Sequence, residues 1–556
     1  MQAVIKIERP RTFIENVWTC GPVRQLQAFE VVRELTDSTQ AHLLQQFLAY
    51  FERRLGSDRF DLIDQLAGGG VALAIRFEQR MPGIVLVVQG TNGSTMRRFV
   101  QLGMELLEDE LTRQEAKERP RKSKYRNLET IGLGKDLFAA QVGAALVLSN
   151  VEKELQLALD LYLDGPEKGL AARPGFLDVR NAIGSGSLSW GWLDLEAVRK
   201  APGAAEIFAA KRNDANLTVL FGGLLDVARR SPFLCAGLYP CDHGFLVSFR
   251  MPRGRDGMPQ ELSAHVPLSC QSGSKPLLKP KNVIFSTSFY LDLAKFFTER
   301  GKLFNAEQVK AIDEFDKKSA TVLAGTPFSK LVGMAGPYQR IVVVHQDQSI
   351  YKTVPSVRLP AFALVTQMRE PERFGKRMEV VLRSAAIFAG LLAPLKLAEE
   401  QYGATHIVGY RFSEDRKSHD PMKDFLFNFS PCFARVGDQF VASSTVELCR
   451  ELIDVLRQQK EAKATGGSAV VCSEMYASAV AALLEARKDR LFTQIILDQA
   501  MPPDQASREI ASLLEWVRGL GSLRAESRYG RNDFRYDITF ETSRVGATHR
   551  PANHLP

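Results

Sequence analysis

The chain has 556 residues, a length that corresponds to roughly three or four ordinary domains. Hydrophobic residues make up 45% of the sequence and charged residues 24%, the proportions of a globular protein with a sizeable core. The formal net charge of +8 is small for this length, so it allows an anionic partner without requiring one.

The sequence contains no segment that we interpret as a membrane span or a secretory signal. The longest apolar run, residues 385–393, is far shorter than the ~20 apolar residues that a spanning helix needs. Residues 3–7 predict a strand rather than a basic segment followed by an apolar one. We therefore expect a cytoplasmic protein by default. Because the predicted strand begins as early as residue 3, we expect an exported protein if an export segment precedes it.

The cysteines do not form a recognisable framework. They are odd in number and scattered, and no pair has the spacing C-x-x-C; they are Cys20, Cys235, Cys241, Cys270, Cys432, Cys449 and Cys472. We expect neither a disulfide framework nor a zinc site, and the pattern favours a reducing compartment.

In chain order, the first half alternates helices with strand hairpins. Residues 4–7 predict a strand, and 38–55 a helix whose apolar residues recur at helical spacing. Asp58 is expected to cap a short helix that ends at the glycines 68–70. The remaining expected elements are a hairpin at 71–77 and 84–88, a helix from Thr95, a basic loop, a hairpin at 137–141 and 145–149, a helix at 151–163, a strand at 187–192, a helix from Asp194, and a hairpin at 234–239 and 245–251.

The same order of elements returns about 280 residues further along the chain. An apolar strand that follows Pro82 and ends at Gln89 matches one that follows Pro360 and ends at Gln367, and each precedes a long helix. We predict a tandem duplication and an α+β fold, in which antiparallel hairpins alternate with helices and two similar lobes pack together. The sequence leaves open whether the lobes share one sheet.

The predicted domain map has four parts. Residues 1–253 form the first α+β copy, and residues 281–542 form the second. Residues 254–280, rich in Pro, Gly and Ser, are predicted to be a linker. The polar tail 543–556 is predicted to be disordered.

The residues that the two copies share are structural in type. Pro82/Pro360 and Gly143/Gly437 punctuate strands and turns, and Ser149/Ser443 stand where a strand meets a helix, which predicts N-caps. The copies share no acid, base or nucleophile, so we predict no catalytic residue. The eight histidines show no ligand spacing, and we predict neither a metal site nor a cofactor. Trp190 and Trp192 lie on one face of a strand and are expected to pack in the core.

The richest polar feature is a basic stretch before the hairpin at 137–149. Its cations are Arg113, Lys117, Arg119, Arg121, Lys122, Lys124 and Arg126. Our first interpretation is a solvated loop between a helix and a strand; the alternative is a contact with nucleic acid, a lipid headgroup or an acidic partner. Because Tyr125 is the only aromatic residue in it, stacking on nucleic acid bases is not expected.

Three motifs resemble those of a bacterial protein family classed as a domain of unknown function. They are DQLAGGG at residues 64–70, YLDL at 290–293 and FNFSPC at 427–432. The resemblance covers most of residues 1–460 and implies duplicated α+β modules, in proteins that are often exported or tethered to a membrane. Because that family has no assigned activity, the resemblance transfers no functional residue.

Three hypotheses for function follow. The first is a non-enzymatic binding or scaffold protein, which meets a protein or envelope partner through sheet surfaces or the groove between lobes. The alternative is a hydrolase-type enzyme with its site in that groove. A second alternative is anion or nucleic-acid contact through residues 113–126. The sequence leaves the ligand, the partner and the oligomeric state open.

Overall fold

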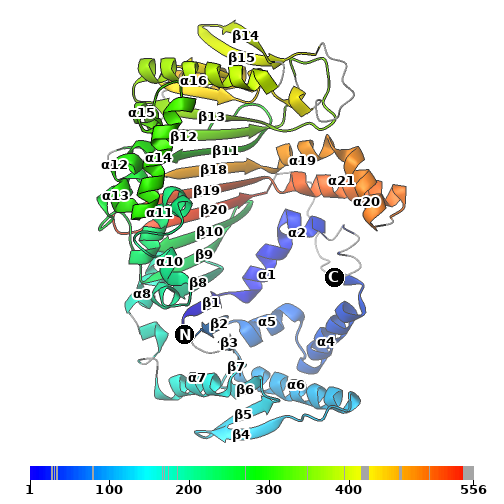
Figure 1. The fold of residues 1–556 in the computed structure, drawn as a ribbon. Coiled ribbons are helices and arrows are strands. Elements are labelled where there is room, and N and C mark those ends of the chain that lie inside the picture. The colour runs from blue at the N-terminus through cyan, green and yellow to red at the C-terminus, as the bar shows by residue number, and fades with distance from the viewer. Residues whose placement is uncertain are drawn as a thin grey trace. The chain divides into compact units, whose positions relative to one another are not determined.

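The computed structural model is a mixed α+β structure with antiparallel strands (Figure 1). It describes all residues except 27–28, 30–31, 33–35, 78–80, 166, 168, 173, 185, 269–270, 347–348, 393–394, 415–424, 463–465, 500 and 543–556. The predicted α+β class is confirmed. The predicted disordered tail lies outside the described residues.

The chain divides into two compact units. Unit 1 comprises Met1–Lys200 and Ser231–Pro252, and unit 2 comprises Ala201–Arg230 and Arg253–Pro556. The helix of residues 215–230 therefore belongs to unit 2, although it lies within the first predicted copy.

The described strands of unit 1 form one antiparallel sheet. They are β1 (Ala3–Ile7), β2 (Gly70–Arg76), β3 (Gly83–Gln89), β4 (Arg121–Tyr125), β5 (Leu128–Leu133), β6 (Leu137–Val142), β7 (Ala145–Ser149), β8 (Ser189–Asp194), β9 (Phe233–Cys241) and β10 (Gly244–Met251). Their spatial order is β4-β5-β6-β7-β3-β2-β1-β8-β9-β10.

Unit 2 is built in the same way. Its described strands are β11 (Val283–Tyr290), β12 (Ala335–Val344), β13 (Ala361–Met368), β14 (Leu395–Tyr402), β15 (Thr405–Phe412), β16 (Cys432–Val436), β17 (Gln439–Ser443), β18 (Val471–Tyr476), β19 (Ser522–Tyr529) and β20 (Phe534–Glu541). Their order is β14-β15-β16-β17-β13-β12-β11-β18-β19-β20, which is the order of unit 1 with each label raised by ten. We keep tandem duplication as our proposed explanation for this common order.

Helices precede and follow the strands in both units. Those of unit 1 are α1 (Pro10–Thr19), α2 (Gly21–Leu26), α4 (Thr39–Leu55), α5 (Arg59–Ala67), α6 (Gly93–Arg113), α7 (Glu152–Asp164), α8 (Pro174–Ile183) and α9 (Leu195–Arg199), with the 3-10 turn η2 (Leu170–Ala172). Ser38 caps α4, and the Asp58 carboxylate accepts two backbone N–H groups of α5, as predicted.

Unit 2 has more helices between its strands. They are α10 (Ala204–Ile207), α11 (Ala215–Arg230), α12 (Leu293–Thr298), α13 (Arg300–Leu303), α14 (Ala306–Val322), α15 (Phe328–Met334), α16 (Pro371–Leu392), α18 (Val446–Glu461), α19 (Ala477–Glu485), α20 (Lys488–Gln499) and α21 (Pro503–Gly519), with the 3-10 turns η3 (Gln260–Ala264) and η4 (Phe425–Asn428).

One helix covers one face of each sheet. It is α7, which follows β7, in unit 1 and α18, which follows β17, in unit 2. In unit 2, Leu452 and Ile453 of α18 are fully buried against Ala363 and Val365 of β13 and Val342 of β12. In unit 1, Leu155 and Leu159 of α7 pack against Val85, Ala140 and Val147. Because successive strand residues point to opposite faces, the residues between these core positions must point the other way.

The sequence did not predict the hairpin that forms one edge of the sheet in each unit. The basic loop is in part the strand β4, paired with β5, and the segment after α16 forms β14 and β15. Both outer strands are charged, with sequences RKSKY and LKLAEEQY. The first has no apolar alternation, and in the second it ends after Leu397, so neither matches the pattern by which strands are predicted. Charge on an edge strand is a common protection against pairing with another molecule.

The predicted N-caps Ser149 and Ser443 are corrected. The caps of α7 and α18 are Val151 and Thr445, two residues further along. Each serine hydroxyl instead accepts the backbone N–H of that capping residue, at 3.1 Å for Ser149 and 3.3 Å for Ser443. The serines therefore shape the turn before the helix. Trp190 and Trp192 are buried in the unit 1 core, as predicted.

The segment that we predicted as a linker packs within unit 2. Leu278 is fully buried in the same core as α18, and Ala264 is fully buried in another cluster of the unit. The buried Arg340 donates to the carbonyl oxygen of Pro276, and the Gln459 amide donates to that of Leu277. The described residues of 254–280 are thus held in unit 2 at several points rather than forming a free linker.

A buried carboxylate anchors α11 in unit 2. Asp226 is 1% exposed and accepts hydrogen bonds from Arg229 and Arg230, both at 2.7 Å. Arg230 also donates to the carbonyl oxygens of Gly254 and Asp256. Asp226 thus holds Arg230 of the same helix in place, and Arg230 joins α11 to residues 254 and 256 of unit 2.

We predict that Asp226→Ala lowers the free energy of unfolding of unit 2 by about 3 kcal/mol, because it leaves two arginines without their buried counter-charge. Urea unfolding and hydrogen exchange of α11 measure the loss. The control is Asp313→Ala, which breaks the exposed pair with Arg300 and is expected to cost under about 1 kcal/mol. Equal losses in the two variants would contradict an anchoring role for Asp226.

Candidate functional site

The face of the unit 2 sheet that α18 leaves uncovered carries a row of apolar side chains. Cross-strand pairing places one such residue on each of six strands, in the order Phe362, Val343, Phe285, Met475, Leu523 and Phe540. We call this row the apolar strip. With ~4.8 Å between neighbouring strands, it is about 24 Å long.

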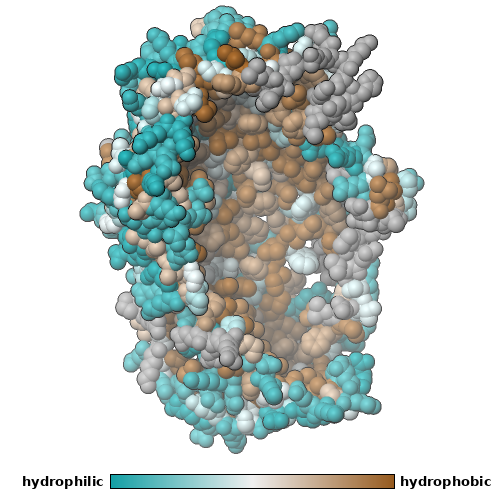
Figure 2. Space-filling model, in the orientation of Figure 1, coloured by the Kyte–Doolittle hydropathy of each residue, from teal (hydrophilic) through white to brown (hydrophobic). Residues whose placement is uncertain are grey.

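The apolar strip is accessible to solvent. Phe362 is 53% exposed, Met475 40% and Leu523 37%, and the other members are half-buried. Leu364, on the same face of β13, is 43% exposed. Figure 2 shows hydrophobic side chains over this face of unit 2, recessed behind the hydrophilic surface of the flanking helices. Exposed apolar side chains that adjoin in this way are typical of an interaction surface.

Helices cover the same face at its other end. Met368 and Phe440 are buried there with Phe374 of α16 and Leu331 of α15. The open part is therefore limited to the strand ends at which the apolar strip lies.

Unit 1 has a corresponding face. Its cross-strand rows are Ile84, Ile75, Ala3, Leu193 and Leu234, and beside them Leu148, Leu86, Leu73 and Ile5. Ile5 is 52% exposed, and the other members are half-buried. An uncovered apolar sheet face is thus common to both units, which the comparison of single residues between copies did not reveal.

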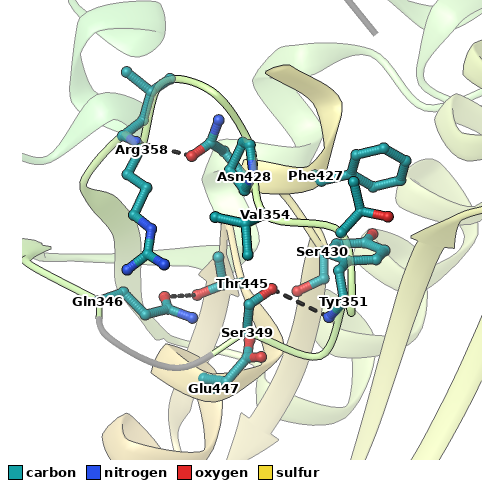
Figure 3. Close-up of a pocket in the computed structure, with 13 residues that line it drawn as sticks. Gln346, Ser349, Tyr351, Val354, Arg358, Phe427, Asn428, Ser430, Thr445 and Glu447 are labelled. Carbon is teal, nitrogen blue, oxygen red and sulfur yellow. Dashed lines mark hydrogen bonds between the residues drawn. The ribbon is translucent and has the colours of Figure 1, made fainter. Parts of the chain in front are cut away.

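A polar pocket lies at the strand ends of unit 2. Its described lining residues belong to the start of α18 and to two connections that have fewer residues in unit 1. These connections are residues 345–360 between β12 and β13, against 77–82, and residues 413–431 between β15 and β16, against 134–136. Within them, residues 347–348 and 415–424 lie outside the described residues. Figure 3 shows Tyr351, Arg358, Phe427 and Asn428 from these connections around the start of α18.

Hydrogen bonds fix the walls of the pocket. The Tyr351 hydroxyl donates to the carbonyl oxygen of Phe429 and accepts the backbone N–H of Phe412. The Asn428 side chain accepts from the backbone of Leu359 and donates to that of Val357. Burial raises the pKa of the Tyr351 phenol, which therefore stays protonated as both donor and acceptor.

The pocket is small and has no activated nucleophile among its described residues. Its volume of about 60 Å³ admits a few water molecules. The hydroxyls of Ser349 and Ser430 accept backbone N–H groups, and the Thr445 hydroxyl donates to the Gln346 side chain. The buried Oε1 of Glu447 has no hydrogen-bond partner among the residues that the structure describes. These groups can bind a small polar group, but they show no nucleophile held by a base.

A larger cavity of about 510 Å³ adjoins the pocket, with Arg358 in the walls of both. This volume falls within the range of ordinary ligand sites, roughly 300–1,000 Å³. Its lining comes from two segments of unit 2 and consists of Pro355, Ser356, Val357, Arg358, Ala486, Arg487, Asp489, Arg490 and Gln494. The Arg487 guanidinium donates to the carbonyl oxygen of Arg358 at 2.6 Å and so joins the two segments.

The basic stretch predicted as an anion contact, residues 113–126, does not form one cationic cluster. Some of its residues form ion pairs within the unit, and others lie on the edge strand β4. Arg126 pairs with Asp160 and Asp164, each at 2.7 Å, and Arg113 pairs with Glu110 at 2.6 Å. Arg119 donates to the carbonyl oxygen of Ala116. The other members are exposed, with Arg121, Lys122 and Lys124 on β4 and Lys117 before it. The structure does not bring these cations to a cavity among the described residues.

Among the described residues, no group of histidine, cysteine and acidic side chains is arranged to hold a metal ion. Burial raises the pKa of the Cys235 and Cys472 thiols to about 11, which keeps them protonated and unreactive near neutral pH. No described helix has the length and apolarity that crossing a bilayer would require.

No family model, curated protein or solved structure matches the chain. The resemblance to a bacterial domain family therefore stays a prediction.

We predict that Tyr351→Phe costs about 1–3 kcal/mol, because it leaves the Phe412 N–H and the Phe429 carbonyl without their partner. Hydrogen exchange of β15 and η4 measures the local loss. Tyr162→Phe is the control, because Tyr162 is 62% exposed. If hydrogen exchange in β15 and in η4 is unchanged in Tyr351→Phe, the Tyr351 hydroxyl does not hold the pocket together.

We predict that Arg121→Thr, Lys122→Thr and Lys124→Thr together promote self-association, because β4 then offers an uncharged edge to another molecule. Size-exclusion chromatography with light scattering measures the mass as concentration rises. A variant with Arg97→Gln, Arg98→Gln and Lys135→Gln removes the same charge elsewhere. Its measured mass should equal that of the unmodified chain at each concentration. Association in both variants would assign the effect to net charge.

Proposed function

We propose that the chain is a non-enzymatic binding protein that takes up a long aliphatic chain on the open faces of its sheets. The observation that carries the proposal is the apolar strip, whose members line up on successive strands and face solvent. Burying this surface supplies binding free energy at roughly 25 cal/mol per Å² of apolar area.

The character of the face supports an aliphatic ligand. The inner strands β13, β12, β11, β18 and β19 each pair on both sides, so their backbone groups are not free to bind an added peptide strand. Attraction must then come from side-chain contact with an apolar partner. The strip extends across six strands with one apolar residue on each, which suits a linear chain laid across the sheet.

The enzyme hypothesis gains less support. The hydroxyls of the polar pocket are engaged with backbone or amide groups, and the cavity beside it is lined by arginines rather than by an acid–base pair. The anion hypothesis for residues 113–126 is weakened by the internal ion pairs of Arg113 and Arg126.

The test uses N-phenylnaphthylamine, a neutral apolar dye whose fluorescence rises in an apolar site. We expect saturable binding to the unmodified protein. A variant with Ile5→Gln, Phe362→Gln and Met475→Gln should bind about fivefold more weakly on the face of unit 1 and about thirtyfold more weakly on the face of unit 2, since each substitution removes roughly 1 kcal/mol of apolar contact. These side chains are exposed, so the variant should keep its stability within about 0.5 kcal/mol per site.

The matched control replaces equally exposed apolar residues on helices, as Leu177→Gln, Leu220→Gln and Val322→Gln. It should bind the dye like the unmodified protein. If the unmodified protein shows no saturable binding, or if the control loses as much affinity as the sheet-face variant, the proposed function is wrong.

A further inference from the structure

We infer that unit 2 selects an amphiphile with an anionic head group, whose chain lies on the apolar strip and whose head group meets Arg358, Arg487 and Arg490. This inference rests on the proposed function and names the ligand class for one of its two faces. Three observations support it. The apolar strip lies at one end of the strands, the three arginines lie in segments that leave the sheet at this end, and their guanidinium groups are not neutralised by acids in the cavity.

The apolar strip lies at one end of the strands of unit 2. Phe362 is the second residue of β13, and Leu523 is the second residue of β19. Met475 is the next-to-last residue of β18, which runs antiparallel to β19. The chain therefore leaves the sheet immediately beside the strip.

The arginines belong to connections that leave the sheet at this same end. Arg358 lies three positions before the first residue of β13, and α19, which begins after the last residue of β18, leads directly to Arg487 and Arg490. The hydrogen bond from Arg487 to the Arg358 carbonyl holds these segments together. All three arginines line the cavity of about 510 Å³.

Their charge is not compensated within the cavity. Asp489 is the only acid in the lining, against three arginines. The side chains of Arg358 and Arg490 are exposed, and their guanidinium groups have no ion-pair or hydrogen-bond partner among the described residues, whereas the Nε of Arg487 is buried without a described partner. A buried N–H without a partner costs roughly 1–3 kcal/mol in general, so an acceptor from a ligand is favoured at this point.

The chemistry of arginine identifies the head group. A guanidinium presents paired N–H donors that match the oxygens of a carboxylate or phosphate. The Gln494 amide and the Ser356 hydroxyl lie in the same lining and can donate further hydrogen bonds. An oxyanion attached to a long chain would thus satisfy the arginines and cover the strip at once.

Unit 1 differs at this point. Its connection between β2 and β3 is the short segment 77–82, where unit 2 has 345–360 with Arg358. The selection for an anionic head group is therefore assigned to unit 2 alone, although both units carry an open apolar face.

The test is displacement of N-phenylnaphthylamine by oleate and by oleyl alcohol, which share a chain and differ in the head group. It is made below the critical micelle concentration and in an Ile5→Gln background, so that unit 2 dominates the signal. We expect oleate to displace the dye at about tenfold lower concentration than oleyl alcohol, the effect of a charged hydrogen bond. Arg358→Gln with Arg490→Gln should bring the two ligands to equal potency by weakening oleate.

The control variant, Arg97→Gln with Arg98→Gln, removes the same charge from exposed positions of α6 in unit 1 and should keep the preference for oleate. Inorganic phosphate, which has no chain, should not displace the dye. Displacement by phosphate would assign the arginines to a free anion and overturn the inference.

The outcomes separate the two proposals. If both ligands displace the dye equally from the protein with intact arginines, or if the arginine variant keeps the preference, the head-group inference is overturned while the proposed function stands. If the dye does not bind saturably, the proposed function has failed. If the dye binds but neither ligand displaces it, the site does not take a long aliphatic chain and both proposals are wrong.

Discussion

The alternation of side chains along antiparallel strands is the constraint on which the rest of the structure depends. In unit 2 it sends Ala363 and Val365 of β13 to a face that α18 covers, and it sends Phe362 and Leu364 to the opposite face. At the strand ends that carry Phe362, the apolar side chains of this second face stay in contact with solvent. The core and the candidate binding surface thus arise from the same strand sequence.

The two units use one strand order with different additions. Both have the covered face, the open apolar face and the charged outer hairpin. Unit 2 adds longer connections between β12 and β13 and between β15 and β16, and these bring a polar pocket and Arg358 to the strand ends. Connections tolerate such insertions because they carry few of the contacts that hold the sheet together. The differences in chemistry between the units accordingly lie in loops.

Sequence reasoning succeeded where the pattern was strong and local. The hairpins around Pro82 and Pro360, the cap at Asp58 and the burial of Trp190 all follow from apolar periodicity or from turn chemistry. It failed at β4 and β14, because an edge strand is stabilised by one neighbour and tolerates charge on its exposed side. It also interpreted residues 254–280 as a linker, because the core that they join lies far away in the sequence.

The sequence by itself determined the α+β class, the repeated order of elements and the absence of any recognisable catalytic motif, because these depend on local periodicity and on spacing. Only the tertiary structure decided which apolar face each sheet leaves open, since strand alternation does not say which side a helix will cover. The tertiary structure also brings Arg358 into the lining of the same cavity as Arg487 and Arg490, which lie more than a hundred positions away along the chain. A site of this kind is created by the packing of distant connections, and no local sequence pattern records it.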